Sequence, residues 1–268
     1  MYRSVVRADR VDGKRNGEMS MEFSDKVAII TGVAGGIGLA TAAMLGKQGA
    51  TVIGWDFQEE RLEQARKALQ ARNIEMTAVN ADLININKIK ALFEKTIEDF
   101  KRIDILVQCA GICYQSPVPE ITPEEWDHIF ALNLKSVFFA AQAALKVMCR
   151  QNYGKIINIS SASGKSGGVA VGAHYAATKA AVICLTKSLA LYSAPFAVNV
   201  NCVCPGPIKT PMTDVWGEAM NKSFAQKIPF KRYGTPEEVA EAICFLASDR
   251  ARYITGETVD VNGGLVMD

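Results

Sequence analysis

The sequence predicts an α/β protein built on a doubly wound parallel sheet of about seven strands, with helices on both faces. Three observations lead to this fold class. From residue 26 onward, short apolar runs of strand length alternate with stretches of helix length. A glycine-rich turn joins the first strand to the first helix, and no linker-like segment interrupts the series. Strands that alternate with helices form right-handed βαβ units, which place the strands parallel to one another.

The individual elements follow from the same alternation. The predicted strands are 27–31, 51–56, 74–82, 103–111, 155–161, 197–203 and 257–261. The predicted helices are about 37–48, 59–72, 85–100, 122–151, 174–193 and 236–248. Asn85 is placed to cap the third helix, because asparagine is a favoured N-cap residue. Thr122, Pro123 and Glu125 form a capping-box start to the fourth.

The first 24 residues follow a different pattern. They are charged, contain glycine and show no periodicity, which predicts a basic, flexible tail before a single domain of residues 25–268. The segment lacks the apolar stretch of a signal peptide, and its acidic residues are unlike a mitochondrial transit peptide. An upstream extension before a start at Met19 or Met21 is equally an interpretation of this segment.

Composition excludes several classes of function. At 268 residues and 49% hydrophobic content, the chain can bury a large core. A net charge of +2 does not indicate a basic surface that would bind nucleic acid. Two histidines supply few zinc ligands, so no metal is predicted. Seven cysteines without a CxxC pair favour a reduced, cytoplasmic location. We find no apolar run long enough to span a bilayer, so no membrane partner is expected.

The stretch TGVAGGIGLA at 31–40 follows the first strand and opens the first helix. Gly32 permits a tight turn, Gly36 lets the backbone approach a pyrophosphate, and Gly38 allows close packing of helix on strand. The helix N-terminus offers free N–H groups to an anion. Together with an acidic residue at the end of the next strand, this context predicts a Rossmann-type dinucleotide site.

Tyr175 and Lys179 lie four residues apart where an apolar helix begins, so they share one helical face. Such a pair can simply be solvated. Hydride transfer to or from an alcohol carbon, however, also requires a proton carrier at the oxygen. A tyrosine with a pKa of about 10 is a poor base at neutral pH. A nearby ammonium and a positive nicotinamide ring would favour the phenolate and lower that pKa.

Several motifs occur in a fixed order along the chain: the glycine loop at 31–38, Asn133, the pair Ser160-Ser161, Tyr175-x-x-x-Lys179 and PGPIKT at 205–210. In this order they resemble the short-chain dehydrogenase/reductase family, of the compact single-domain type. The resemblance extends from about residue 25 to the C-terminus. The segment YITGETVDVNGG at 253–264 is also similar to the family's last helix-to-strand region.

The resemblance implies a catalytic set of Asn133, Ser161, Tyr175 and Lys179. Ser161 would donate a hydrogen bond to the substrate oxygen, and Asn133 would hold a water that links Lys179 to solvent. Lys179 would also bind the ribose hydroxyls, and Asp82 would lie near the adenine. The cofactor contacts implied in this way are Gly32, Gly36, Ile37, Gly38, Asp56, Asp82, Leu83, Ala110, Gly111, Tyr175, Lys179, Pro205, Gly206, Ile208 and Thr210.

Two positions depart from the family pattern. Cys109 stands where the family usually has the asparagine of an Asn-Ala-Gly motif, a residue that braces the central sheet. Ser161 lies fourteen residues before Tyr175, where thirteen is usual. The glycine-rich segment that follows Ser161 can absorb one extra residue. Ser160 and Ser163 are the less favoured candidates for the same role.

Asp56 predicts that the cofactor is NAD(H) rather than NADP(H). It ends the second strand, where a carboxylate can accept hydrogen bonds from both adenosine-ribose hydroxyls. A 2′-phosphate would meet a like charge there. Gly35 and Phe57 occupy the places where a basic residue would offset that charge, and Arg61 lies in the next helix. Asp56 could also merely cap that helix, and the two roles are compatible.

Three functions are consistent with these residues. The first is an NAD-dependent oxidoreductase that transfers a hydride between the nicotinamide and a secondary alcohol of the polyol, sugar-acid or steroid-like kind. The second is a 3-oxoacyl-thioester reductase, although such reductases usually prefer the phosphorylated cofactor. The third is a non-catalytic dinucleotide-sensing scaffold. A scaffold would be expected to lose part of the Ser–Tyr–Lys set, and this chain keeps all of it.

The substrate pocket and the assembly are predicted more coarsely. Residues 212–230 are expected to form a mobile lid over the site. The residues expected to contact the substrate, a small alcohol or ketone, are Ser163, His174, Met212 and Trp216. His174 could instead be structural, since helix neighbours do not share a face with each other. The resemblance implies a homotetramer, or a homodimer, built through the helices at 122–151 and 174–193 and the final strand.

Overall fold

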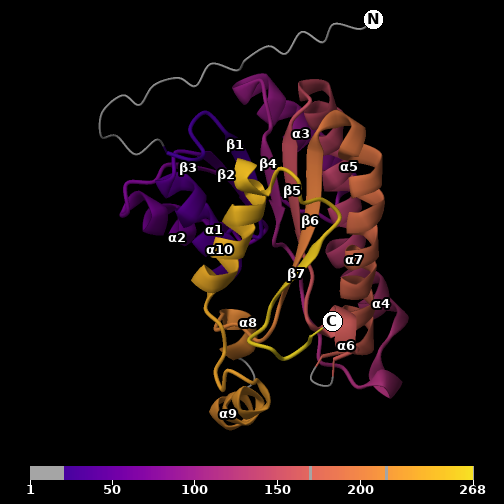
Figure 1. Ribbon diagram of the computed structural model, residues 1–268. Coiled ribbons are helices and arrows are strands. Elements are labelled where there is room, and N and C mark those ends of the chain that lie inside the picture. Colours follow the sequence, from indigo (N-terminus) through magenta and orange to yellow (C-terminus); the bar gives the residue numbers. More distant parts are fainter. Residues whose placement is uncertain (1–20, 169–170, 215–216, 268) are drawn as a thin grey trace, which may run out of the picture.

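The computed structural model describes residues 21–168, 171–214 and 217–267. The predicted fold class is confirmed, because seven parallel strands form one sheet in the order β3-β2-β1-β4-β5-β6-β7 (Figure 1). The strands are β1 (Val27–Thr31), β2 (Thr51–Asp56), β3 (Met76–Asn80), β4 (Ile105–Gln108), β5 (Gly154–Ile159), β6 (Val198–Pro205) and β7 (Thr258–Val261). The strand order reverses between β1 and β4, and ligands bind beyond the carboxyl ends of strands at such a switch point.

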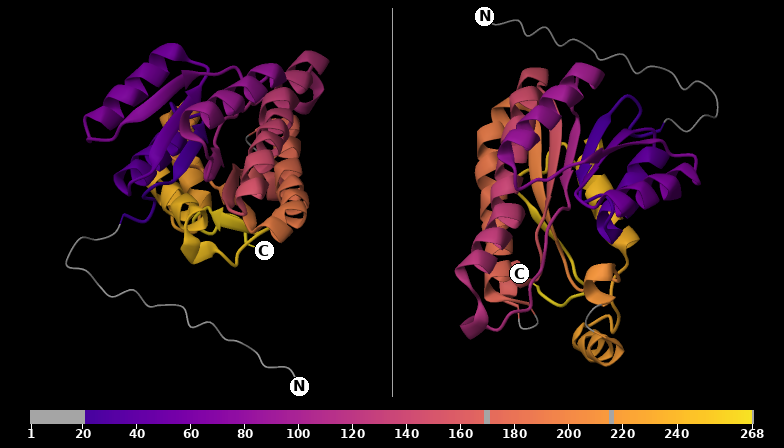
Figure 2. Two further views of the ribbon diagram at one scale, coloured as in Figure 1. Left: turned by 90° about the horizontal axis from the view of Figure 1, so that it is seen from above. Right: turned by 180° about the vertical axis from the view of Figure 1, so that it is seen from behind.

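Two layers of helices cover the sheet (Figures 1 and 2). One layer contains α1 (Gly36–Lys47), α2 (Glu59–Gln70) and α10 (Pro236–Ala247), and the other contains α3 (Ile86–Phe100), α5 (Ser136–Gln151) and α7 (Ala173–Ser193). A separate apolar cluster fills each interface, with Leu45 and Ile243 in the first and Phe93 and Leu145 in the second. Strands buried on both faces are mostly apolar, which explains why β1 appears as a nearly continuous apolar run.

The shorter elements gather mainly at the ends of the strands. They are η1 (Val118–Glu120), α4 (Pro123–Phe130), the π-helical turn η2 (Ala131–Lys135), α6 (Ser163–Ser166), η3 (Ala194–Phe196), α8 (Pro211–Asp214), α9 (Glu218–Lys227) and η4 (Asp249–Ala251). In Figure 1, α6, α8 and α9 all lie at the lower end of the molecule. This is the end at which the parallel strands terminate, so these helices surround the predicted site.

The long helix predicted over 122–151 consists of α4, η2 and α5 in succession. Thr122 caps α4 by accepting a hydrogen bond from the N–H of Glu125 at 3.2 Å. The predicted capping box is only half formed, because the Glu125 carboxylate bonds to other segments and not to Thr122. The π-turn carries Asn133, and π-turns within helices are frequent at functional sites.

The sequence predicted no segment able to span a membrane, and this helix tests that prediction. Pro123–Gln151 is long and apolar enough to cross a bilayer by length and composition, with a mean hydropathy of 1.3 over its most apolar window. That expectation does not hold for this helix. The core helix of a globular domain passes the same test, and 44% of this window is buried inside the molecule. Ala140, Ala144 and Met148 of the helix pack in the second apolar cluster.

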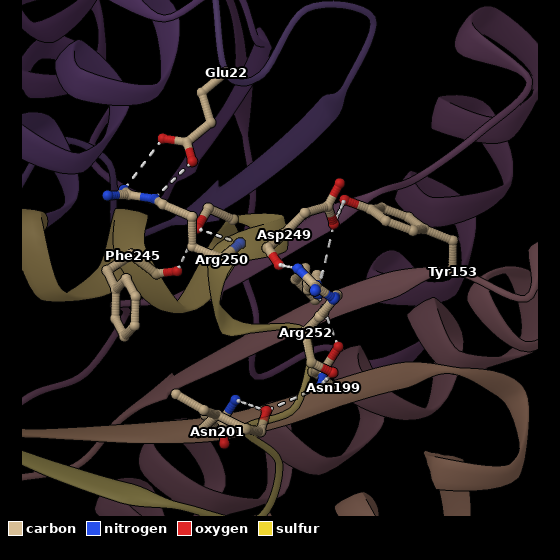
Figure 3. Close-up of polar contacts among 11 residues, drawn as sticks. Glu22, Tyr153, Asn199, Asn201, Phe245, Asp249, Arg250 and Arg252 are labelled. Carbon is tan, nitrogen blue, oxygen red and sulfur yellow. Dashed lines mark hydrogen bonds and ion pairs between the residues drawn. The ribbon is translucent and has the colours of Figure 1, made fainter. Parts of the chain in front are cut away.

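The folded domain begins earlier than residue 25. Phe23 is buried in the first apolar cluster, and its N–H donates to the carbonyl of Gln48 at 2.9 Å. Glu22 forms an ion pair with Arg250 at 2.8 Å, within a set of polar contacts that join the starts of β5 and β6 to the segment after α10 (Figure 3). The predicted tail therefore ends before Glu22, and its residues 1–20 lie outside the described residues.

Candidate active site

Glycines in the turn after β1 allow a close packing that any side chain would prevent. A Cβ built at Gly32, where φ is +66°, would lie 2.7 Å from the N of Ala110. A Cβ at Gly36 would lie 2.7 Å from Cγ2 of Thr210, and one at Gly38 would contact the carbonyl of Gly32. No side chain caps the N-terminus of α1, so its N–H groups are available to an anion. These N–H groups are suited to bind the pyrophosphate of a dinucleotide.

Acidic residues lie at the carboxyl ends of β2 and β3. Asp56 ends β2, and its Oδ2 accepts a hydrogen bond from the N–H of Ala34 in the glycine loop at 3.0 Å. Its Oδ1 accepts from the N–H of Gln58 at 3.1 Å, so the carboxylate also caps the entry to α2. Asp82 follows β3 and accepts from the N–H of Ile84 at 3.0 Å. Both carboxylates therefore lie at the edge of the sheet where the adenosine half of a dinucleotide would bind.

The predicted proton-transfer pair lies at the start of α7. Tyr175 and Lys179 are both buried, and Lys179 Nζ lies 5.7 Å from the centre of the tyrosine ring. The Nζ donates to the carbonyl of Ile159, the last residue of β5, at 2.9 Å. The helix places the two side chains on one face, and the end of β5 fixes the ammonium.

The serine pair divides into two roles. The Ser161 hydroxyl acts to lower the pKa of Tyr175, so the two side chains lie near each other, and its Oγ accepts a hydrogen bond from the N–H of Ser163 at 3.1 Å. Ser160 is buried, and its hydroxyl donates to the carbonyl of Lys179 at 2.7 Å. Of the three serines considered, Ser161 is the one that the structure brings to the tyrosine.

Burial dominates the electrostatics of the pair. It raises the pKa of Tyr175, with a smaller contribution from the nearby Cys113 thiol, while the Ser161 hydroxyl acts in the opposite sense. Burial likewise lowers the pKa of Lys179. The sequence predicted that Lys179 would lower the pKa of Tyr175. The direction in the structure is the reverse, because burial penalises the charged phenolate and is the largest influence on the pKa of Tyr175.

Asn133 and Lys179 meet across a glycine. A Cβ built at Gly111 would lie 3.1 Å from Asn133 Oδ1 and 3.5 Å from Lys179 Nζ. Any larger residue would fill the space between these two groups. A water held in that space could link the amide to the ammonium, which is the role that the family resemblance implies for Asn133. Asn133 itself is fully buried.

The segment after β6 completes the site. Pro205 ends the strand, and the N–H of Gly206 donates to the carbonyl of Val261 at 3.0 Å. Ile208 is buried in the first apolar cluster, and this anchors Thr210 against the glycine loop at Gly36. The PGPIKT motif and the first glycine loop are therefore in contact in space, as one cofactor site requires.

The residues predicted to contact substrate are placed unequally. Ser163 opens α6 beside Ser161, whereas His174 is fully buried, with Nε2 2.8 Å from Glu125 Oε1. The burial of His174 and its contact with Glu125 indicate a structural role. Met212 lies in α8, which follows the PGPIKT motif, and Trp216 lies outside the described residues.

Sequence reasoning missed Cys113, which lies close enough to Tyr175 and Lys179 to influence both. Burial raises the pKa of its thiol to about 11, and raises that of Cys109 at the end of β4 to about 12. The signal in the sequence that could have identified Cys113 was its position two residues after Gly111. Among the residues that the structure describes, no cluster of histidine, cysteine, aspartate and glutamate could hold a metal ion.

Comparisons with known proteins agree with this geometry. Residues 32–266 match the family model described as enoyl-(acyl carrier protein) reductase. The chain is 38% identical over 247 residues to a Thermotoga maritima protein named 3-oxoacyl-[acyl-carrier-protein] reductase FabG, covering 92% of this chain and all of that protein. A Rickettsia felis protein of the same name is 40% identical over 247 residues, covering 92% and 99%. The crystal structure of gox2181 superposes with a TM-score of 0.88 at 34% identity, covering 92% of this chain and 97% of that one.

Proposed function

This chain belongs to the short-chain dehydrogenase/reductase family, and we propose that it is an NAD(H)-dependent reductase of 3-oxoacyl thioesters. The observation that carries the proposal is the buried Tyr175, with Ser161 near it and Lys179 one helical turn away. The names of the relatives supply the substrate class. They favour the thioester alternative over the polyol, sugar-acid or steroid-like substrates that were the first expectation from the sequence.

The site is suited to protonating an alkoxide. When bound, the nicotinamide would supply the hydride to the ketone carbon. Ser161 would donate a hydrogen bond to the ketone oxygen and fix it beside the Tyr175 hydroxyl. Tyr175 would then give its proton to that oxygen, so that a ketone, a hydride and a proton yield a secondary alcohol. Because burial raises the pKa of Tyr175, the phenol keeps its proton at neutral pH, which favours its use as an acid in reduction.

The preference for NAD(H) within this proposal depends on Asp56. Its carboxylate is held beside the glycine loop by the N–H of Ala34, and a charge there would repel the 2′-phosphate of NADP(H). Phe57, the next residue, is exposed and carries no charge that could offset a phosphate. The names of the relatives do not state a cofactor, so this part of the proposal depends on the carboxylate alone.

We further propose a homotetramer that works in the cytoplasm. Phe138 on α5 and Leu191 and Tyr192 on α7 are exposed apolar side chains, and Tyr253 near β7 is fully exposed. These are the elements that the family resemblance implies for the subunit interfaces. All seven cysteines are free, which suits a reducing compartment. Light scattering on the purified protein measures the assembly, and a monomer at micromolar concentration would contradict it.

The function is tested with a substrate panel in which NADH consumption is followed. The panel contains 3-oxobutanoyl-coenzyme A, the same acyl group on a carrier protein, and ketones derived from polyols, sugar acids and steroids. We expect turnover of the thioesters, and its absence in Tyr175→Phe. Turnover only with the other ketones would restore the first expectation. Cofactor binding without turnover of any compound would support a non-catalytic sensor.

A further inference from the structure

The sequence Thr-Pro-Glu-Glu occurs twice in this chain, and the two copies behave differently. At the start of α10, Glu238 Oε2 accepts a hydrogen bond from the N–H of Thr235 at 2.8 Å, which completes a capping box. At the start of α4, the equivalent Glu125 turns away from Thr122. Its Oε1 instead lies 2.5 Å from the Ser116 hydroxyl and 2.8 Å from His174 Nε2. Glu125 therefore connects α4 to the loop before it and to the start of α7, which is forty-nine residues away.

One of these segments is the first turn of α7. His174 is fully buried there, directly before Tyr175. Its Nε2 faces a carboxylate, so we assign the ring proton to Nε2, which donates to Glu125. Its ring stacks on Tyr114 with the centres 5.8 Å apart and the planes 8° apart. The carbonyl of Tyr114 accepts from the N–H of Gly172, the N-cap of α7, at 2.7 Å.

The other segment is the loop that follows Gly111. Ser116 anchors its far end to Glu125, and Asn133 anchors its near end by bonding both backbone groups of Ile112. Cys113 lies between these two anchors and next to Tyr175. The loop and the first turn of α7 are thus joined by Glu125, by the Tyr114–His174 stack and by the Tyr114–Gly172 hydrogen bond.

We propose that Glu125 is a positioning residue for the reduction. By holding Ser116 and His174 on one carboxylate oxygen, it fixes the first turn of α7, and with it Tyr175, relative to the loop that follows Gly111. Glu125 does not touch the reacting atoms and acts through His174. This inference rests on the proposed function. A displacement of about 1 Å in a reacting group can cost about a hundredfold in rate, so the loss of the link should slow proton transfer.

Three variants separate positioning from helix stability. Glu125→Ala removes both hydrogen bonds, whereas Glu125→Gln can keep them, because both end on the same oxygen and a glutamine carbonyl can replace it. Thr122→Ala is the matched control, since it removes the α4 cap and leaves the Glu125 side chain intact. We expect kcat to fall about 10-fold to 100-fold in Glu125→Ala, and to stay within about threefold of wild type in the other two.

Two further measurements distinguish a positioning role of Glu125 from a general loss of structure. The KM for NADH should change much less than kcat in Glu125→Ala, because the glycine loop of the cofactor site lies on other elements. The solvent deuterium isotope effect on kcat should increase, because proton transfer becomes slower. The inference is overturned if Glu125→Ala and Thr122→Ala lower kcat equally, or if Glu125→Gln is as slow as Glu125→Ala.

Hydrogen exchange tests the link without any activity. Peptides covering 110–118 and 172–179 should exchange faster in Glu125→Ala than in wild type, and at the wild-type rate in Thr122→Ala. If the wild-type protein reduces no compound in the panel but this pattern appears, the proposed function fails and the link stands. If the wild type is active and exchange in both segments is unchanged by Glu125→Ala, the inference fails and the proposed function stands.

Discussion

Asn133 holds both backbone groups of Ile112. Its Oδ1 accepts the N–H at 2.9 Å, and its Nδ2 donates to the carbonyl at 2.8 Å. The amide that the family resemblance connects with a catalytic water is therefore also a clamp on the loop after β4. The two roles are compatible, because Oδ1 also faces the space kept open by Gly111. Substituting Asn133 would therefore disturb both the water site and the clamp on the loop after β4.

Tyr175→Phe should abolish turnover and leave cofactor binding nearly intact. The ring and its packing remain, and only the proton carrier is lost. The measurement is kcat beside the dissociation constant for NADH, taken from fluorescence titration. A kcat equal to that of the wild type would remove Tyr175 from the mechanism. Weaker NADH binding together with lost turnover would instead indicate that the phenol mainly holds the cofactor.

The two reaction directions should respond differently to pH. Burial raises the pKa of Tyr175 above its ordinary value of about 10, so the phenol stays protonated through neutral pH. Reduction uses the phenol and should change by less than about twofold between about pH 6 and about pH 8. Oxidation uses the phenolate and should rise toward about tenfold per pH unit over that interval. A reduction rate that falls steeply across it would show that Tyr175 titrates near neutrality.

Cys109→Asn should preserve activity, because it restores the residue that the family usually has at this position. The Cys109 N–H donates to the carbonyl of Thr31, and that backbone bond does not depend on the side chain. The side chain packs against the first apolar cluster, and burial raises its pKa to about 12, so the thiol is neutral. We expect an equal or higher melting temperature. A large decrease would show that the local packing has adapted to the thiol.

The alternation of strands and helices was enough to predict the fold, but the ends of the strands were predicted too long. The fourth strand was expected over 103–111, and β4 spans Ile105–Gln108. Ile103 is buried without belonging to the strand, and Cys109 to Gly111 form the loop at the cofactor site. A buried residue beside a strand has the same local pattern as one within it, so apolar character alone overextends the prediction.

The candidate catalytic residues could be identified from ordered motifs, whereas their environment in the fold could not be predicted. The Thr-Pro-Glu-Glu sequence predicted a capping box at Thr122 just as it would at Thr235. The difference arises from His174, forty-nine residues away from Glu125. In the same way, the direction of the Tyr175 pKa shift depends on burial, which tertiary packing decides and local sequence does not show.

Variants at Asp56 test whether the protein prefers NADH or NADPH. Its Oδ2 accepts the Ala34 N–H at 3.0 Å, which fixes a negative charge where a 2′-phosphate would bind. We expect kcat/KM with NADH to exceed that with NADPH by at least about tenfold, equivalent to about 1.4 kcal/mol. Asp56→Asn keeps an acceptor for Ala34 and removes the charge, so it should erode the preference mainly by improving NADPH.

Asp56→Ala removes the acceptor as well, so the two variants separate charge from loop geometry. If charge decides the preference, both should gain activity with NADPH to a similar extent. Asp56→Ala alone should also lose activity with NADH, because the glycine loop is no longer held at Ala34. Equal or better turnover of the wild type with NADPH would overturn the NAD(H) assignment. It would leave the thioester-reductase proposal intact, because the Tyr175 site does not depend on the adenosine end of the cofactor.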